Sequence, residues 1–251
     1  MPSAYRDAAV YDRISGPLEQ IGREVLERLK LNGTETVLDA GCGSGRVTQA
    51  LLERLAHGHV IGLDGSAQML AGARKRLGER VQLIQQDLEQ LDLGGQVVDA
   101  VFSTATFHWV EDHSHLFGRL RAVLREGGQL VAQCGGVGNT PQLLQAARSV
   151  GSRPPFDRYL GEWDGPWTFA TPAQTAVRLR AAGFTDIRTW LVARPAPYED
   201  LREWLQANAL TAHTARLPEE LQEPFLEAVA RRLGPNPTIT YIRLNLDAIA
   251  G

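Results

Sequence analysis

The chain has 251 residues, 43% of them hydrophobic and 22% charged, and its formal net charge is only -3. This composition excludes an intrinsically disordered chain and predicts one large globular domain with a sizeable core. The slight negative charge argues against nucleic acid as a partner, and no apolar run approaches the length of a membrane span. Neither nucleic acid nor a membrane is therefore expected as a partner.

The two cysteines, Cys42 and Cys134, are far apart in the sequence and form no CxxC pair. They predict neither a disulfide framework nor a structural zinc site, which favours a reducing compartment. The first fifteen residues, MPSAYRDAAVYDRIS, carry charges and no apolar core, so a signal peptide is not expected. We therefore expect a cytoplasmic protein, either a monomer or a homodimer.

Short apolar segments alternate with helical patterns from residue 36 onward. The strands predicted in this region cover residues 36–40, 59–63, 81–86, 97–103 and 129–134. The helices predicted between them cover residues 46–55, 67–77 and 115–125. This alternation is typical of βαβ units, which build a parallel sheet with helices on both faces.

The pattern is looser after Gly135. Helices are predicted over 139–150, from Thr171-Pro172 to Gly183, and over 199–212 and 218–233, with strands over 185–192 and 239–246. We expect one domain, 1–251, built on a doubly wound, mostly parallel, seven-stranded Rossmann-like sheet. Residues 36–135 would form its cofactor-binding core, and a helical lid would comprise residues 1–30, 139–183 and 198–237.

The first predicted strand ends in a glycine-rich turn, VLDAGCGSG at 37–45, that leads directly into a helix. Glycines allow a tight turn and close approach to a ligand, and the N–H groups of the next helix suit an anionic group. A dinucleotide fingerprint, GxGxxG, would require glycine where Arg46 stands. Asp39 would repel a pyrophosphate but suits a ligand that carries an ammonium group. An NAD(P)-dependent oxidoreductase is therefore the weaker alternative.

Three further strand ends carry polar residues. Asp64, about twenty residues beyond the glycine turn, can accept hydrogen bonds from both hydroxyls of a ribose. The carboxylate of Asp87 and the backbone N–H of Leu88 could hold an adenine edge. The segment that contains His108 and Trp109 follows the fourth strand, close to where the reactive end of the ligand should lie.

In these features the chain resembles class I S-adenosylmethionine (SAM)-dependent methyltransferases. The matching segments are VLDAGCGSG at 37–45, GLDGS at 62–66, QQDL at 85–88, FSTATFHWV at 102–110 and LREGGQLV at 124–131. The resemblance implies that Asp39, Gly41 and Gly43 line the methionine moiety, Asp64 binds the ribose and Met69 packs on the adenine. The full set of SAM-binding residues that it implies is Tyr11, Asp39, Ala40, Gly41, Cys42, Gly43, Asp64, Gly65, Met69, Asp87, Leu88 and Ser103.

Within that superfamily the chain is similar to trans-aconitate methyltransferase-like proteins, on GGVGN at 135–139, WTF at 167–169, AGF at 182–184 and YIRLN at 241–245. This resemblance implies methyl transfer to a small molecule, with a carboxylate oxygen as the acceptor. Trp109, Trp167 and Arg158 are the candidate substrate contacts, as aromatic walls and as a partner for a carboxylate.

His108 is the candidate catalytic residue, as a general base or by positioning the substrate. Because a carboxylate acceptor is already ionised at neutral pH, a carboxylate substrate favours the positioning role. The spacing of His108, Asp112, His113 and His115 does not predict a metal site, since residues two apart do not share a helix face.

Each site residue also has a structural alternative. The aspartates could serve only as turn or cap residues, and Met69 and Leu88 could belong to the core. A catalytically silent SAM-binding regulatory module would have the same strand-end motifs, so this second class of function stays open.

Overall fold

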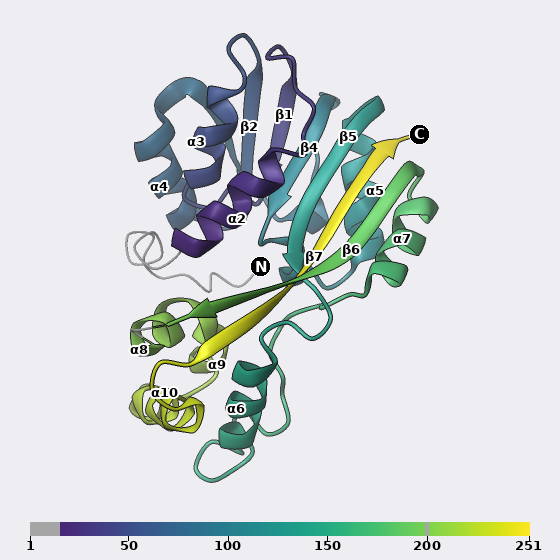
Figure 1. The fold of residues 1–251 in the computed structure, drawn as a ribbon. Coiled ribbons are helices and arrows are strands. Elements are labelled where there is room, and N and C mark those ends of the chain that lie inside the picture. The colour runs from purple at the N-terminus through teal and green to yellow at the C-terminus, as the bar shows by residue number, and fades with distance from the viewer. Residues whose placement is uncertain (1–15, 199–200) are drawn as a thin grey trace.

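The computed structural model describes residues 16–198 and 201–251, which form a seven-stranded sheet in the order β3-β2-β1-β4-β5-β7-β6 (Figure 1). The strands are β1 (Thr36–Ala40), β2 (His59–Asp64), β3 (Val81–Gln85), β4 (Val98–Thr104), β5 (Leu124–Gly135), β6 (Phe184–Pro197) and β7 (Thr238–Ala250). Strands β1 to β5 are parallel, and β7 is antiparallel to both of its neighbours, β5 and β6. The predicted doubly wound, mostly parallel sheet is confirmed.

The strand order reverses between β1 and β4. The chain proceeds outward from β1 through β2 to β3, and then returns to place β4 on the other side of β1. In open α/β sheets, ligands bind beyond the carboxyl ends of the strands at this switch point. The topology therefore directs attention to the tips of β1 and β4.

The longer helices follow the sequence pattern closely. They are α2 (Gly16–Leu26), α3 (Arg46–Glu53), α4 (Ala67–Leu77), α5 (His113–Val123), α6 (Pro141–Gly151), α7 (Pro172–Ala181) and α10 (Glu219–Leu233). Helix α7 begins as predicted, because Thr171 and Gln174 each accept the other's backbone N–H through their side chains, both at 3.1 Å.

Two helix predictions need correction. Helix α5 starts two residues before the predicted residue 115, because the Asp112 carboxylate accepts the N–H groups of Ser114 and His115 and so caps the helix. Residues 199 and 200 of the helix predicted over 199–212 lie outside the described residues, and over 201–212 the prediction of one continuous helix is wrong. The chain there forms two short helices, α8 (Leu201–Trp204) and α9 (Thr211–Thr214), joined by a π-helical turn over Leu205–Ala209.

Helices cover both faces of the sheet (Figure 1). On one face, residues of α2, α3 and α4 pack with alternate residues of the strands, including Phe102 of β4. On the other face, α5 and α7 bury Phe117 and Leu179 against the remaining strand residues. Residues 172–181, part of the predicted lid segment 139–183, therefore pack on the sheet.

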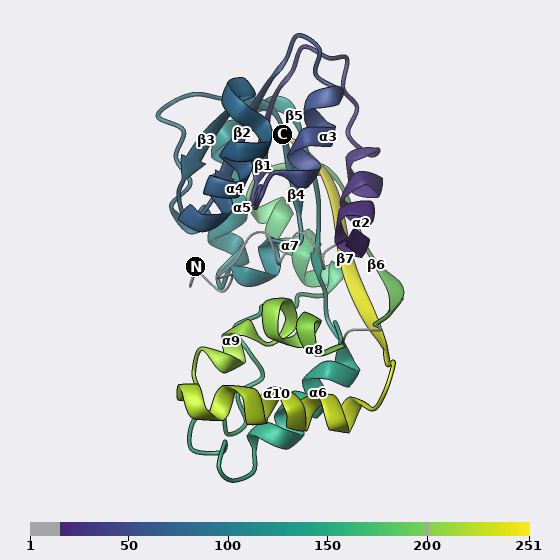
Figure 2. The same cartoon turned by 90° about the vertical axis from the view of Figure 1, so that its left-hand side faces the viewer.

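Four helices, α6, α8, α9 and α10, gather beyond the carboxyl ends of the parallel strands, and we call them the outer helices (Figure 2). They share a separate core with Phe225 and Trp204 at its centre. Strand β6 exceeds its predicted range because it continues past the sheet, where it forms a two-stranded ribbon with the first part of β7. Strand β7 exceeds its predicted range mainly by residues 247–250, which pair inside the sheet. Ile239 and Tyr241 of β7 lie in the outer core, whereas Leu244 and Leu246 lie in the core of the sheet.

Within residues 16–198 and 201–251, no helix is both long enough and apolar enough to cross a membrane.

Replacement of Leu179 by alanine should lower the free energy of unfolding by about 2–5 kcal/mol, because it removes a fully buried side chain that fixes α7 to the sheet. Urea unfolding followed by circular dichroism measures the change. Val177→Ala is the matched control on the same helix, since Val177 is 62% exposed and its loss should change the free energy by less than about 0.5 kcal/mol. Equal effects of the two substitutions would contradict this packing.

Candidate functional site

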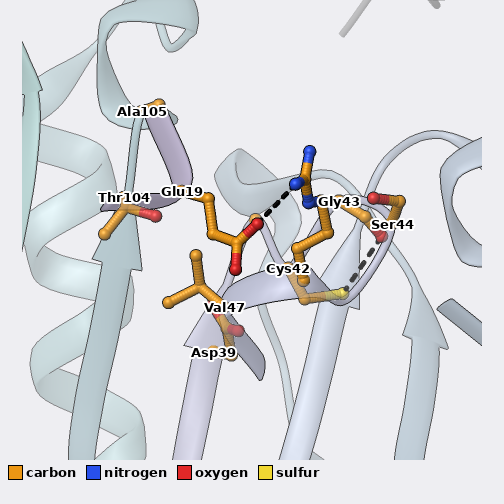
Figure 3. Close-up of a pocket in the computed structure, with 10 residues that line it drawn as sticks. Glu19, Asp39, Cys42, Gly43, Ser44, Val47, Thr104 and Ala105 are labelled. Carbon is orange, nitrogen blue, oxygen red and sulfur yellow. Dashed lines mark hydrogen bonds and ion pairs between the residues drawn. The ribbon is translucent and has the colours of Figure 1, made fainter. Parts of the chain in front are cut away.

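A hollow lies at the switch point, between the tips of β1 and β4 and the start of α3 (Figure 3). About 500 Å³ of empty space lies within this hollow and its mouth. The residues that line it are Glu19, Asp39, Gly41, Cys42, Gly43, Ser44, Arg46, Val47, Thr104 and Ala105. Four residues predicted to bind a cofactor, Asp39, Gly41, Cys42 and Gly43, are thus brought together in one wall.

The glycine turn is held against β2 and opens toward the hollow. The N–H groups of Gly41 and Cys42 both donate to the carbonyl oxygen of Leu63, at 2.7 and 3.0 Å. Gly41 has φ +88°, and a Cβ atom there would lie 2.2 Å from Oγ1 of Thr106. Gly43 has φ +55°, but no atom lies within 4 Å of the place where its Cβ would be. The backbone at residue 43 therefore leaves room for a ligand to approach closely.

The Asp39 carboxyl lies at the floor of the hollow and is buried. Its Oδ2 accepts a hydrogen bond of 2.7 Å from the hydroxyl of Thr48 in α3. Burial, with a smaller contribution from the nearby Asp64, raises the pKa of Asp39 to about 7, although the hydrogen bond from the Thr48 hydroxyl opposes the shift. This acid is costly to ionise in the protein alone, and a cation placed beside it would favour its charged form.

Asp64 lies at the tip of β2 and supports the glycine turn. Its Oδ2 accepts the N–H of Gly43 at 3.0 Å, and its Oδ1 accepts the N–H of Ser66 at 2.8 Å. Burial raises the pKa of Asp64 despite these two bonds. Each carboxylate oxygen can accept another hydrogen bond, so Asp64 can bind hydroxyl groups while it holds the turn in place. Gly65 lies between Asp64 and Ser66, next to these contacts.

Two charged residues that sequence reasoning did not assign to the site form an ion pair in the hollow. Glu19 of α2 approaches Arg46, the first residue of α3, with an N–O distance of 2.5 Å (Figure 3). The sequence motif drew attention to Arg46 only as the residue that breaks a dinucleotide fingerprint. Glu19 has no sequence signal, because its place depends on how α2 packs across the sheet.

Thr104 and Ala105 form the opposite wall of the hollow. Thr104 is the last residue of β4 and Ala105 follows it. Both belong to segment 102–110, which carries the family resemblance, but neither was predicted as a site residue. Ser103 was predicted to bind the cofactor. It is fully buried and donates its hydroxyl hydrogen to the carbonyl oxygen of Ala40 at 2.6 Å. Ser103 and Ala40 therefore join the strands β1 and β4 directly at the switch point.

The residues predicted to contact adenine are not among those that line the hollow. Met69 is buried in the first turn of α4, and Leu88 is buried in the core of the sheet. The Asp87 carboxylate accepts the N–H of Glu89 at 3.0 Å and so begins a short 3₁₀ turn. Their roles toward a cofactor stay predictions. Tyr11 lies outside the described residues.

His108 is buried between the sheet and an aromatic cluster. Its Nδ1 accepts the N–H of Gly135 at 3.2 Å, which leaves the ring hydrogen of the neutral side chain on Nε2. Burial, and then the charges of Arg243 and His113, hold the pKa of His108 well below its ordinary value. The imidazole is therefore neutral at pH 7 and offers an N–H donor.

The aromatic residues around His108 connect the sheet to the outer helices. Phe169 stacks on the His108 ring with centroids 5.9 Å apart, and Trp167 stacks on Phe169 at 5.9 Å. Trp109 meets Trp167 edge to face at 5.6 Å. Arg158, by contrast, is exposed, with its guanidinium 5.8 Å from the centre of the Tyr159 ring. The structure thus groups the predicted substrate residues Trp109 and Trp167 near His108 and places Arg158 on the surface.

Comparisons with known proteins identify the family of this chain. Residues 38–132 match the family model described as a methyltransferase domain. A trans-aconitate 2-methyltransferase from Acidovorax ebreus is 40% identical over 51% of this chain and 48% of its own length, so the match spans about half of that relative. A second protein of that name, from Variovorax paradoxus, is 31% identical over 90% of this chain and 87% of its own length.

A solved structure of Haemonchus contortus phosphoethanolamine N-methyltransferase 2 in complex with S-adenosyl-L-methionine has a similar fold. It superposes with a TM-score of 0.63 and 19% identity, over 96% of this chain and 56% of that one. Fold and site define a doubly wound α/β protein with a hollow at its switch point. The chain belongs to the family of SAM-dependent methyltransferases that includes the trans-aconitate 2-methyltransferases.

The raised pKa of Asp39 predicts how stability depends on pH. The folded protein holds this proton up to about pH 7, whereas an unfolded aspartate loses it near its ordinary pKa of 3.8. Ionising the buried acid therefore lowers the free energy of unfolding by about 2–3 kcal/mol between pH 5 and pH 8. Asp39→Asn has no acid to ionise at this position. The stability of this variant relative to the unaltered protein should therefore increase from pH 5 to pH 8, as measured by thermal unfolding without ligand.

Asp99→Asn is the matched control. Burial alone would raise the pKa of Asp99, but hydrogen bonds from Thr36 and Arg125 hold it below its ordinary value. Asp99 is therefore ionised in both the folded and the unfolded chain above pH 5. The difference in stability between Asp99→Asn and the unaltered protein should stay constant between pH 5 and 8. If the difference for Asp39→Asn is constant over this range too, the pKa of Asp39 is not raised.

Proposed function

We propose that this protein is an enzyme that uses SAM to methylate a small molecule, with a carboxylate oxygen as the acceptor. The observation that carries the proposal is the buried Asp39 carboxyl beside the open glycine turn, next to Asp64. The family to which the chain belongs supports SAM as the methyl donor. The name of the Variovorax and Acidovorax relatives supports a carboxylic acid as the acceptor.

The side chains present fit this cofactor. SAM carries an ammonium group and a sulfonium, and Asp39 provides a buried carboxyl that such a cation would ionise. The Asp64 carboxylate has acceptor capacity for the two ribose hydroxyls. Gly41 and Gly43 would allow the methionine part to approach the backbone. We further assign Ala40, Cys42, Gly65, Met69, Asp87, Leu88, Ser103 and Tyr11 to the surroundings of the cofactor.

For methyl transfer, the protein needs mainly to orient the acceptor toward the methyl group and to exclude water from the site. Bound SAM supplies a methyl group on a positively charged sulfur, which a nucleophile attacks in line with the leaving sulfur. A carboxylate is already ionised at neutral pH, so it needs no general base. The neutral His108 ring, with its hydrogen on Nε2, is suited to donate to an acceptor oxygen, and we assign it a positioning role. Trp109 and Trp167 would exclude water from the acceptor side.

The outer helices are placed to act as a lid on the acceptor side, since they lie beyond the carboxyl ends of the parallel strands. Residues 139–171 and 198–237 would then determine which molecule enters, within a single domain formed by the whole chain. The cytoplasmic location and the choice between monomer and homodimer stay predictions.

Asp39→Ala should weaken SAM binding by about tenfold to a hundredfold in isothermal titration calorimetry, because a hydrogen bond to a charged group is lost. Asp99→Asn, on the same sheet but outside the hollow, should bind SAM as the unaltered protein does. NAD should cause no thermal shift at concentrations at which SAM does. Unchanged SAM affinity in Asp39→Ala would remove Asp39 from the cofactor site.

Incubation of the protein with SAM and a panel of small carboxylic acids, phenols and amines should yield methyl esters of acids, detected by mass spectrometry. Asp39→Ala should yield less product at low SAM concentration, which ties the product to this site. Tight SAM binding with no product from any acceptor would instead indicate the silent regulatory module. Products only from phenols or amines would refute the carboxylate acceptor and would require a base.

A further inference from the structure

Glu19 places a carboxylate at the hollow from outside the sheet. It belongs to α2, the helix that precedes β1, and it lines the hollow together with Asp39 of β1. The Glu19 side chain is 23% exposed. Its Oε2 lies 2.5 Å from a guanidinium nitrogen of Arg46, and its Oε1 accepts the Nε–H of Arg23 at 3.2 Å. Two cations therefore fix the carboxylate of Glu19 beside the hollow.

Gly22 brings the backbone of α2 close to the same space. A Cβ atom at Gly22 would lie 2.6 Å from Cγ2 of Val47 and 3.6 Å from Oγ1 of Thr104. Val47 and Thr104 both line the hollow, the first from α3 and the second from β4. Residues three apart share a face of a helix, so Glu19 lies one turn before Gly22 on that face. Helix α2 therefore closes one side of the hollow, and Glu19 is the acid that it contributes there.

Carboxyl groups thus lie on two sides of one space. Figure 3 shows Glu19 between the glycine turn and the wall of Thr104 and Ala105, with Asp39 nearer the floor of the hollow. The described residues that line the hollow comprise two acids, Glu19 and Asp39, and one base, Arg46, which offsets part of the charge of Glu19. A cationic centre in this space is therefore favoured over a neutral one of the same shape.

We propose that Glu19 is a specificity-determining residue, which favours the charged methyl donor over the neutral product that remains after transfer. This inference rests on the proposed function, since it takes the hollow as the site of SAM. In the transfer, an electron pair of the acceptor forms the bond to the methyl carbon, and the electrons of the carbon–sulfur bond stay on sulfur. The sulfonium becomes the neutral thioether of S-adenosylhomocysteine, whereas the ammonium and carboxylate of the methionine part are unchanged. The attraction of Glu19 for the sulfur is therefore lost at that step.

The other two acids of the site are placed near parts that the donor and the product share. Asp64 supports the glycine turn and is assigned to the ribose hydroxyls. Asp39 lies at the floor, beside the glycine turn assigned to the methionine part. Glu19 lies toward Thr104 and Ala105 at the end of β4, where the reactive end of the donor is expected. Of the three carboxyl groups, that of Glu19 is thus best placed to respond to the charge on sulfur.

The test compares ligands that differ in this one charge. SAM and sinefungin carry a positive charge at the sulfur position, and S-adenosylhomocysteine carries none there. In calorimetry the unaltered protein should bind the two charged ligands more tightly than the neutral one. Glu19→Gln should reduce this preference about threefold to tenfold, because it removes the negative charge and keeps the shape of the side chain. Glu19→Asp, which sets the charge one carbon farther back, should retain part of the preference.

Glu24→Gln is the matched control. Glu24 is also on α2, but it pairs with Arg194 of β6 at 2.6 Å and is not among the residues that line the hollow. Its substitution should leave the preference for the charged ligands unchanged. Binding of methylthioadenosine, which lacks both the ammonium and the sulfonium, shows that a variant is folded with an intact nucleoside site.

Two results would overturn the inference. The first is a preference in Glu19→Gln equal to that of the unaltered protein, because Glu19 would then serve only to fasten α2 to α3. The second is no preference in the unaltered protein. If Glu19→Gln fails to bind methylthioadenosine normally, added salt decides. The preference of the unaltered protein should fall between about 0.05 M and about 0.5 M KCl, since ions screen charges at an open site, and a constant preference would overturn the inference.

The outcome for the proposed function is separate. If neither SAM nor S-adenosylhomocysteine binds the unaltered protein, the proposed function is refuted together with this inference. A preference that depends on Glu19, without methylation of any acceptor, would uphold the role of Glu19 and refute the proposed function.

Discussion

The burial of one carboxyl group, that of Asp39, is the constraint on which the site depends. The carboxyl lies at the tip of β1, where the strand order reverses, and only the Thr48 hydroxyl hydrogen-bonds it directly among the contacts described above. Burial makes its charged form unfavourable, which is why its pKa rises to about 7. The glycine turn beside it leaves space at Gly43, and Asp64 fixes that turn from the neighbouring strand. A cationic ligand would relieve the cost of ionising this acid.

Acidic groups lie at the tips of two neighbouring strands in this site. Asp39 and Asp64 lie around the glycine turn, and the cationic methyl donor proposed for the site would be attracted to them. The neutral His108 ring lies between the sheet and the aromatic cluster and adds a hydrogen-bond donor without adding charge.

The parallel part of the sheet was predictable because the sequence patterns that specify it lie within short segments of the chain. Strand periodicity, the glycine turn and the aspartates at strand ends are all visible within short segments, and they predicted the wall formed by Asp39 and Gly43. The start of α5 was missed because Asp112 caps the helix earlier than the apolar pattern suggests. Glu19 was missed for another reason. It reaches the hollow through the packing of α2 against α3 and the sheet, which no short segment of the sequence shows.

The ribbon formed by the outer parts of β6 and β7 has a consequence for engineering. It carries apolar side chains, Ile239 among them, that pack in the core shared with the outer helices. A shortened chain without those helices would expose this apolar face to solvent, and large exposed apolar patches promote aggregation. A chimera designed to have the acceptor preference of a relative should therefore replace residues 136–243 as one block. The ribbon then keeps the outer helices that pack on it.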